Sequence, residues 1–185
     1  MDKRTLILQS TLKLITENGF HGTPVSMIAA DSGVAAGTIY RYFKNKEDII
    51  NELYTYVKTD FNNAILGEIY TGISIRDEYY LKWRNMVDYY INNPLEAKFI
   101  EQYAASPYIN GDVIKSNLEK YSHLRDLYKR AIDSSTIRKI SYEAVTIVMF
   151  GTVNQLYRIY NLNTLNIDEK VTNEVFQIFW DGVKQ

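Results

Sequence analysis

Small, hydroxyl-bearing and cationic side chains meet in one short segment of the chain, residues 36–46, whose sequence is AGTIYRYFKNK. At about 100° per residue, helical periodicity places four of them on one side of a short helix: Gly37, Thr38, Arg41 and Tyr42. The hydroxyls of Thr38 and Tyr42 can donate hydrogen bonds, and an arginine can bind a guanine edge or a phosphate. This side of the helix is therefore suited to the groove of a nucleic acid.

The opposite side of this helix is mostly apolar and consists of Ala36, Ile39, Tyr40 and Phe43. It can pack on a preceding short helix, which we expect over residues 25–31 with Thr23 as N-cap and Pro24 in the first turn. Gly33 suits the positive φ of a tight turn between the two helices, and Val34 can pack from that turn into the core. Two short helices joined in this way form a helix-turn-helix, whose second helix lies in the major groove of DNA.

The second of these helices begins without bulky side chains, because residues 35–37 are AAG. Such a helix start can approach a DNA edge closely, and it presents unpaired backbone N–H groups to phosphate. Lys46, in the first turn of the next helix, can reach a flanking phosphate. The candidate DNA-binding residues are therefore Thr23, Ser26, Ala36, Gly37, Thr38, Tyr40, Arg41, Tyr42 and Lys46.

The charge of the chain restricts how it could bind a nucleic acid. Its 185 residues carry a formal net charge of −1 and 46% of them are hydrophobic, so we expect a sizeable core and exclude a broad basic surface. Residues 36–46 contain Arg41, Lys44 and Lys46 and no acidic residue. Any contact with DNA must therefore be a small, focused patch.

What the sequence lacks restricts location and cofactors. Cysteine is absent, so there are no disulfides and no thiolate metal site. The start of the chain is charged and then amphipathic, unlike a signal peptide, and the most apolar stretch, residues 144–153, is about half as long as a bilayer requires. We expect a cytoplasmic protein with no membrane partner and no cofactor.

Helical periodicity dominates the chain and no segment alternates as a strand does, which predicts an all-α fold. Residues 1–45 contain three short helices, and residues 46–185 contain about six more, most of them long. We take these two segments as the two domains. The expected helices span residues 2–18, 25–31, 36–43, 46–66 or 46–70, 75–91, 94–105, 108–132, 137–160 and 167–183, about nine in all.

The last two of these helices allow two interpretations. Residues 144–153 are apolar on nearly every face of a helix, and the last helix has an apolar stripe that includes Val175 and Phe179. The pair could be a central core helix with its packing neighbour, or it could also pack against a second copy of the chain. The pattern alone does not choose between them.

Aromatic residues are the second conspicuous feature, with 16 tyrosines and two tryptophans. Tyrosine combines a large contact area with a polar group, so a cluster of aromatics in the middle helices could line a pocket for a flat ligand. The alternative is that the same residues form the core. The candidate ligand-binding residues are Trp83, Tyr90, Phe99, Tyr103, Tyr121 and Tyr128.

Catalytic and metal-binding groups are scarce. The two histidines are His21 and His123, and only His123 has acidic residues at helical spacing, Glu119 and Asp126. With one histidine and no cysteine, this face is better interpreted as an ordinary polar surface than as a metal site. We therefore expect neither a metal nor an enzymatic activity.

Residues 28–49 resemble the signature of the TetR-type bacterial transcriptional regulators, I-A-x-x-x-G-V-x-x-G-x-[IL]-Y-x-[YH]-F-x-x-K-x-x-[LI]. Every fixed position is filled, by Ile28, Ala29, Gly33, Val34, Gly37, Ile39, Tyr40, Tyr42, Phe43, Lys46 and Ile49. The chain departs from the family at Pro24 and Met27, where hydroxyl and polar or acidic residues are frequent. The resemblance covers residues 5–50 or so; beyond them it extends only to length and helical layout.

The resemblance implies that residues 1–45 bind DNA and that residues 46–185 bind a ligand and dimerise. Two subunits would pair through the last two helices, with Val145, Met149, Val153, Val175 and Phe179 as the candidate dimerisation residues. The dimer would bind a near-palindromic double-stranded operator. A small-molecule effector would move the fourth helix and release the DNA.

Three hypotheses follow from the sequence. The leading one is a ligand-responsive, dimeric DNA-binding repressor. The second is a helical adaptor that keeps the helix-turn-helix fold and acts through protein partners, which the net charge near zero favours. The third is a small helical enzyme, for which the sequence offers no catalytic groups.

Overall fold

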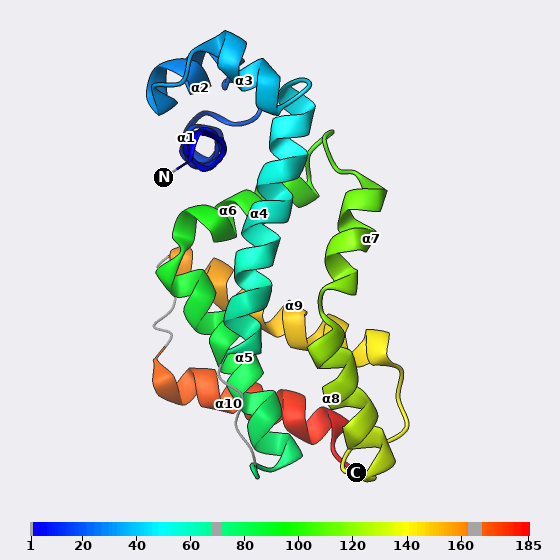
Figure 1. Cartoon of the computed structure of the whole chain (residues 1–185). Helices are drawn as coiled ribbons and strands as arrows, with labels where there is room; N and C mark the ends of the chain where they lie inside the picture. The colour runs from blue at the N-terminus through cyan, green and yellow to red at the C-terminus, as the bar shows by residue number, and fades with distance from the viewer. Residues whose placement is uncertain (1, 68–71, 163–167) are drawn as a thin grey trace. The chain divides into compact units, whose positions relative to one another are not determined.

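The structure, a computed structural model, describes residues 2–67, 72–162 and 168–185. These residues form ten α-helices (Figure 1) and, apart from an isolated antiparallel bridge between Ile137 and Lys184, no strand pairing. The all-α prediction is therefore confirmed. The helices are α1 (Lys3–Asn18), α2 (Val25–Ser32), α3 (Ala36–Tyr42), α4 (Lys46–Leu66), α5 (Ile75–Asn92), α6 (Pro94–Ala104), α7 (Gly111–Glu119), α8 (Ser122–Asp133), α9 (Tyr142–Asn161) and α10 (Glu169–Val183).

Contacts between residues divide the chain into two compact units. Unit 1 contains the residues up to Asp60 together with Asn93–Lys120, and unit 2 contains Phe61–Asn92 together with Tyr121–Gln185. Unit 1 thus includes α6 and α7 and the larger part of α4, whereas the domain division predicted from the sequence falls between residues 45 and 46. The cause is that α6 packs on α1 and inserts the buried side chains of Phe99 and Tyr103 into the core of the N-terminal helices.

Local residue chemistry explains the ends of the first helices. The Asp2 carboxylate accepts a hydrogen bond from the backbone N–H of Thr5 (3.0 Å) and caps α1, and Gly19 ends that helix with a φ of 73°. Gly33 ends α2 in the left-handed region, with a φ of 67°, and the next residue, Val34, is buried. Both glycines adopt the positive φ that few other residues tolerate, and for Gly33 this confirms the prediction from the sequence.

Unit 2 is built around an aromatic core between α5, α9 and α10. The Trp83 side chain is fully buried, and its Nε1–H donates a hydrogen bond to Thr152 Oγ1 (3.1 Å) on α9. The Phe176 ring of α10 packs beside it, with the two ring centroids 5.6 Å apart. These contacts hold Trp83 and Phe176 in the interior of unit 2.

Three predicted helices differ from the observed ones. The predicted helix 108–132 is two helices, because the Asn110 side chain caps the start of α7 and that helix ends before Lys120. The described residues therefore contain ten helices and not nine. The predicted start at residue 137 is too early, since Ile137 pairs with Lys184 and Ser141 caps α9. The last helix begins at Glu169, and its predicted first residue, Ile167, lies outside the described residues.

No helix in the described ranges is both long enough and apolar enough to span a membrane.

Candidate nucleic-acid interface

The helix α3 presents a polar face that its own apolar residues hold in place. Ile39 is fully buried and Phe43, directly after the helix, is 2% exposed, so both anchor α3 in the core of unit 1. Figure 1 shows α2 and α3 as two short helices joined by a tight turn beside α1, and α3 contacts both of them. The predicted helix-turn-helix is therefore present, with Ile39 and Phe43 of the predicted packing side in its core.

The outer face of α3 carries exposed hydrogen-bonding groups. Arg41 is exposed, and among the described residues its guanidinium makes no hydrogen bond or ion pair. Tyr40 and Tyr42 are 55% and 47% exposed, which is unusual for aromatic side chains in a folded domain. Nothing lies within 4 Å of the position that a Cβ at Gly37 would occupy, so the start of α3 is open. This face can donate hydrogen bonds to a groove without first breaking internal ones.

Two residues predicted to pack against α2 are instead exposed. Ala36 and Tyr40 lie on the outer side of α3, because a helix of seven residues rests on its neighbours through a strip that Ile39 and Phe43 already fill. The Tyr40 side chain is therefore open to solvent, and a candidate DNA-binding residue must be open in this way.

Two other candidate DNA-binding side chains have partners inside the protein. Thr23 is fully buried, and its Oγ1 lies 2.9 Å from Gly19 O and 3.1 Å from Leu14 O. The Lys46 ammonium donates to the backbone carbonyl of Phe20, and burial lowers the pKa of that ammonium. Ser26, by contrast, is exposed. In this structure the Thr23 side chain holds the segment between α1 and α2 and is closed to solvent.

We expect Thr23→Val to lower the free energy of unfolding by about 1–2 kcal/mol, because a buried carbonyl then loses its donor. Urea denaturation of the variant beside Thr23→Ser, which keeps the hydroxyl, measures this. The folded Thr23→Val protein should bind DNA like the wild type. An unchanged stability together with weakened DNA binding would instead place this hydroxyl against DNA.

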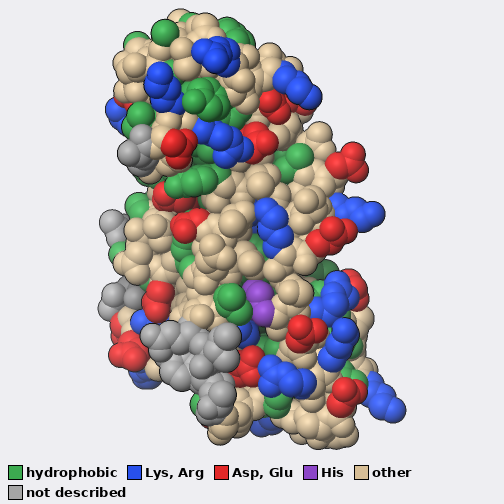
Figure 2. Space-filling view, viewed as in Figure 1, with side chains coloured by type: hydrophobic (Ala, Val, Ile, Leu, Met, Phe, Trp, Pro, Cys, Tyr) green, Lys and Arg blue, Asp and Glu red, His purple; other side chains and the backbone are tan. Residues whose placement is uncertain are grey.

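Charge on the surface is mixed. On the face that Figure 2 displays, the Lys and Arg side chains of the described residues are interspersed with Asp and Glu and form no continuous basic area. Within unit 1, Arg4 pairs with Glu52 and Lys13 pairs with Asp31, so these two cations are partly neutralised. The exposed cation on α3 itself is Arg41, which agrees with a small, focused contact.

Comparison with known proteins now gives the class of the chain. Residues 7–53 match the family model of bacterial regulatory proteins of the tetR family, and residues 75–184 match the model of the tetracyclin repressor-like C-terminal domain. The chain belongs to the tetR family. The tetR family and the relatives described next are transcriptional regulators and not enzymes.

The tetR-family relatives match over part of their length. The fatty acid metabolism regulator protein of Bacillus subtilis (strain 168) is 54% identical over 48 residues, which are 26% of this chain and 25% of that protein. An uncharacterized HTH-type transcriptional regulator of Haemophilus influenzae is 27% identical over 101 residues, 55% of this chain and 54% of that protein. The chain thus aligns with about a quarter to about half of the length of these relatives.

Solved structures of tetR-family proteins resemble the whole chain. A putative tetR family transcription regulator from Shewanella sp. PV-4 has a TM-score of 0.89 and 23% identity and covers 100% of both chains, which shows the fold. The transcriptional regulator FadR from Bacillus subtilis, solved in complex with stearoyl-CoA, has a TM-score of 0.82 and 25% identity and covers 96% of this chain and 98% of that one.

The six aromatics predicted to line a ligand pocket divide between the two units of this tetR-family chain, two in unit 1 and four in unit 2. Phe99 and Tyr103 belong to the core of unit 1, where the Tyr103 hydroxyl donates to Asn51 Oδ1 (2.7 Å). Trp83, Tyr90 and Tyr121 are buried in unit 2. Tyr128, also in unit 2, donates to the backbone carbonyl of Ile140 (2.7 Å).

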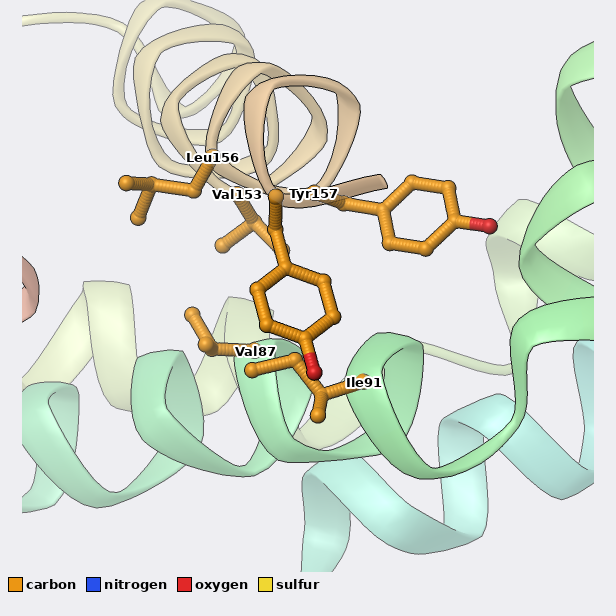
Figure 3. Close-up of a pocket in the computed structure, with 6 residues that line it drawn as sticks. Val87, Ile91, Val153, Leu156 and Tyr157 are labelled. Carbon is orange, nitrogen blue, oxygen red and sulfur yellow. The ribbon is translucent and has the colours of Figure 1, made fainter. Parts of the chain in front are cut away.

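A small apolar cavity lies between α5 and α9 of unit 2. Figure 3 shows Val153 of α9 pointing toward Val87 and Ile91 of α5, and Leu156, Tyr157 and Tyr160 complete the lining. None of these residues is among the predicted ligand-binding ones. In the sequence, this cavity corresponds mainly to aliphatic residues spaced three or four positions apart on each helix. A search for clustered aromatic residues does not find them.

The candidate dimerisation residues lie mainly inside unit 2. Val145, Met149, Val153 and Phe179 are at most 2% exposed, and Val175 is half-buried. Side chains buried in their own chain cannot be covered by a second copy. Other apolar side chains on the same two helices are open, since Ile147 is 71% and Ile178 is 72% exposed. The apolar face of α9 and α10 that remains available is therefore a different one from that predicted.

His123 lies in a partly buried polar environment on α8. Its Nε2 is 2.9 Å from Asn62 Oδ1. No group of three His, Cys, Asp or Glu residues is placed to hold a metal ion within the described part of the chain. Burial, and then the charge of Lys82, lower the pKa of His123 to about 4.

The lowered pKa of His123 predicts a pH-dependent stability. Between the ordinary value of about 6.5 and the folded value, the unfolded chain binds a proton that the folded chain does not, so stability falls as the pH falls through this window and is complete above it. Allowing for partial exposure, we expect a loss of about 1 kcal/mol between pH 7 and pH 5 that disappears in His123→Gln. Urea denaturation at both pH values measures it, with His21→Gln, at an exposed position, as the control. Equal pH dependence in wild type and His123→Gln would contradict the assignment.

Proposed function

We propose that the chain represses transcription as a homodimer that binds a near-palindromic DNA operator and leaves it when a small molecule binds. The observation that carries this proposal is the exposed face of α3, with Gly37, Arg41 and Tyr42 outside and Ile39 and Phe43 holding the helix from within. Membership of the tetR family, whose N-terminal model matches residues 7–53, supports a role of this face in binding DNA.

The chemistry of α3 suits the major groove of DNA. The Arg41 guanidinium can bind the O6 and N7 atoms of a guanine through two hydrogen bonds, and the Tyr40 and Tyr42 hydroxyls can contact phosphates or base edges. In a symmetric dimer the two recognition helices meet the same groove about one helical turn apart, roughly 34–36 Å. The operator is then an inverted repeat with that half-site spacing.

For the dimer interface we propose the exposed apolar face of α9 and α10. Ile147, Val148 and Ile178 are 71%, 47% and 72% exposed, and Gly151 and Gly182 on the same helices have open space where a Cβ would lie. An apolar surface that contains these two glycines allows close approach of the same two helices from a second chain. The predicted residues Val145, Met149, Val153 and Phe179 then support this face from inside.

For the effector we propose a small molecule that binds in unit 2. Repression is relieved if the molecule binds more tightly to the conformation that cannot hold DNA, and a coupling of about 1–3 kcal/mol changes the affinity for DNA about 5- to 150-fold. The helix α4 is one of the three places where the chain passes between the units, because its residues up to Asp60 belong to unit 1 and those from Phe61 to unit 2. The complex of Bacillus subtilis FadR with stearoyl-CoA makes acylated molecules the first class to test.

Selection of bound fragments from random DNA by the purified chain tests the proposal. The expected result is an enriched inverted repeat whose half-sites lie about one helical turn apart. If no sequence is enriched, although circular dichroism shows that the preparation is folded, the proposal is wrong and a role as a protein adaptor is favoured.

A further inference from the structure

The guanidinium of Arg4, in the first turn of α1, lies at the C-terminal end of α3. Its Cζ atom is 5.7 Å from the centroid of the Phe43 ring, and Phe43 directly follows the last residue of α3. The centroid of the Phe43 ring is in turn 6.5 Å from that of Tyr42, a candidate DNA-binding residue. A cation from another helix is thus placed beside the segment that we propose to bind DNA.

The Phe43 ring holds this guanidinium without using its hydrogen-bond donors. The ring belongs to a buried side chain of the core of unit 1, so it is a fixed platform. An arginine attracted to an aromatic ring keeps its N–H groups available for a second partner. The Arg4 side chain is 45% exposed, so a partner outside the chain can reach these donors.

The partner of Arg4 within the chain is an exposed carboxylate. Arg4 Nη2 donates a hydrogen bond to Glu52 Oε2 of α4, and the Glu52 side chain is 41% exposed. An exposed ion pair adds little to stability, because both groups are well hydrated when they separate. Replacing Glu52 by another anion therefore costs little, and phosphate is an anion whose geometry suits the guanidinium.

The surroundings favour a phosphate of DNA as that anion. Lys44, the residue after Phe43, is exposed, and its ammonium makes no hydrogen bond or ion pair among the described residues. The Asp48 carboxylate accepts the backbone N–H of Lys44 (2.9 Å) and is thus occupied within the chain. A helix in the major groove has sugar-phosphate backbone on both sides, so cations near its end can meet phosphates.

We propose that Arg4 binds a phosphate of the DNA backbone beside the groove that α3 enters, and that it leaves Glu52 to do so. Glu52 is then an internal competitor of DNA, because it holds Arg4 while no DNA is bound. Phe43 keeps the guanidinium in place during the exchange. The inference rests on the proposed function, since it adds one contact and one competitor to the same interface.

Titration of the full chain with its selected operator at a series of salt concentrations, followed by fluorescence anisotropy, tests the inference. Each phosphate contact contributes about 0.9 to the slope of log K against log salt. Arg4→Gln removes one contact from each subunit of the dimer, so we expect the slope to fall in magnitude by about 1.8. The affinity at low salt should fall about 10-fold. Arg4→Lys, which keeps the charge, should keep the slope.

Glu52→Gln is the complementary variant. It frees Arg4, so the affinity for the operator should rise about 2- to 5-fold, and most of this gain should vanish in the Arg4→Gln background. Glu47→Gln removes an equal charge from an exposed side chain of the same helix, and its smaller effect measures the long-range part of the gain. Lys13→Gln, at another ion pair of α1, should keep the wild-type slope.

The possible failures are distinguishable. Melting temperatures close to that of the wild type show that the variants are folded, as the exposure of both side chains predicts. An unchanged slope in Arg4→Gln, an equal loss of slope in Arg4→Lys, or a gain from Glu52→Gln that persists without Arg4 overturns the inference. If Arg41→Ala still loses operator binding, the proposed function stands.

A wild type that selects no sequence overturns the proposed function instead. The salt slopes on random duplex DNA then decide the inference, because a phosphate contact also contributes to non-specific binding. A wild type that binds no DNA at all overturns both.

Discussion

Arg41→Ala is expected to weaken binding of the dimer to its selected operator by about 30-fold or more. Each subunit would lose an arginine contact worth about 1–3 kcal/mol, and the two recognition helices of a dimer lose it twice. The fold should not change, because Arg41 is exposed and makes no hydrogen bond or ion pair within the described residues. Fluorescence anisotropy with labelled operator DNA, at one fixed salt concentration, measures the change.

Two further variants show what Arg41 contacts. Arg41→Lys keeps the charge and loses the planar fork, so it should still bind DNA but discriminate poorly between the operator and scrambled DNA if the contact is a guanine edge. A contact with phosphate alone predicts that Arg41→Lys behaves like the wild type. Lys98→Ala on α6, another exposed cation of unit 1, should leave operator binding unchanged. Equal affinities of Arg41→Ala and wild type would count against α3 as the recognition helix.

The double variant Ile147→Asp, Ile178→Asp is expected to convert the dimer into a monomer, with a dimer dissociation constant at least about 100-fold higher. In a symmetric interface the two substitutions place four carboxylates on an apolar surface, where they would lose hydration without gaining partners. The monomer should stay folded, since both side chains are more than 70% exposed in the single chain. Size-exclusion chromatography with light scattering measures the change in mass.

The same variant should lose most of its affinity for the full operator, because a monomer can occupy only one half-site at a time. Leu118→Asp on α7, at a side chain that is 61% exposed, is the matched control and should remain a dimer. A dimer of unchanged stability in the double variant would show that the two copies pair through another surface.

The determinants of the helix-turn-helix are local, and this part of the fold could be predicted from the sequence. Gly33 adopts the positive φ that the turn needs, Val34 packs beneath it, and α3 runs from Ala36 to Tyr42, within one residue of the predicted range. Each of these features depends on residues a few positions apart, so one segment contains the information. The signature of the family extends over the same segment, which is why the class of the chain was evident before its structure.

Contacts between distant segments were decided by the tertiary structure alone. Phe99 and Tyr103 are of the aromatic type that often lines pockets, yet α6 packs on α1 and makes them part of the core of unit 1. On α9, the apolar side chains of Val145 and Ile147 are equivalent in the sequence, but one is 2% and the other 71% exposed. Periodicity shows that a helix has an apolar face and does not show which neighbour covers it, because burial depends on how the other helices are placed.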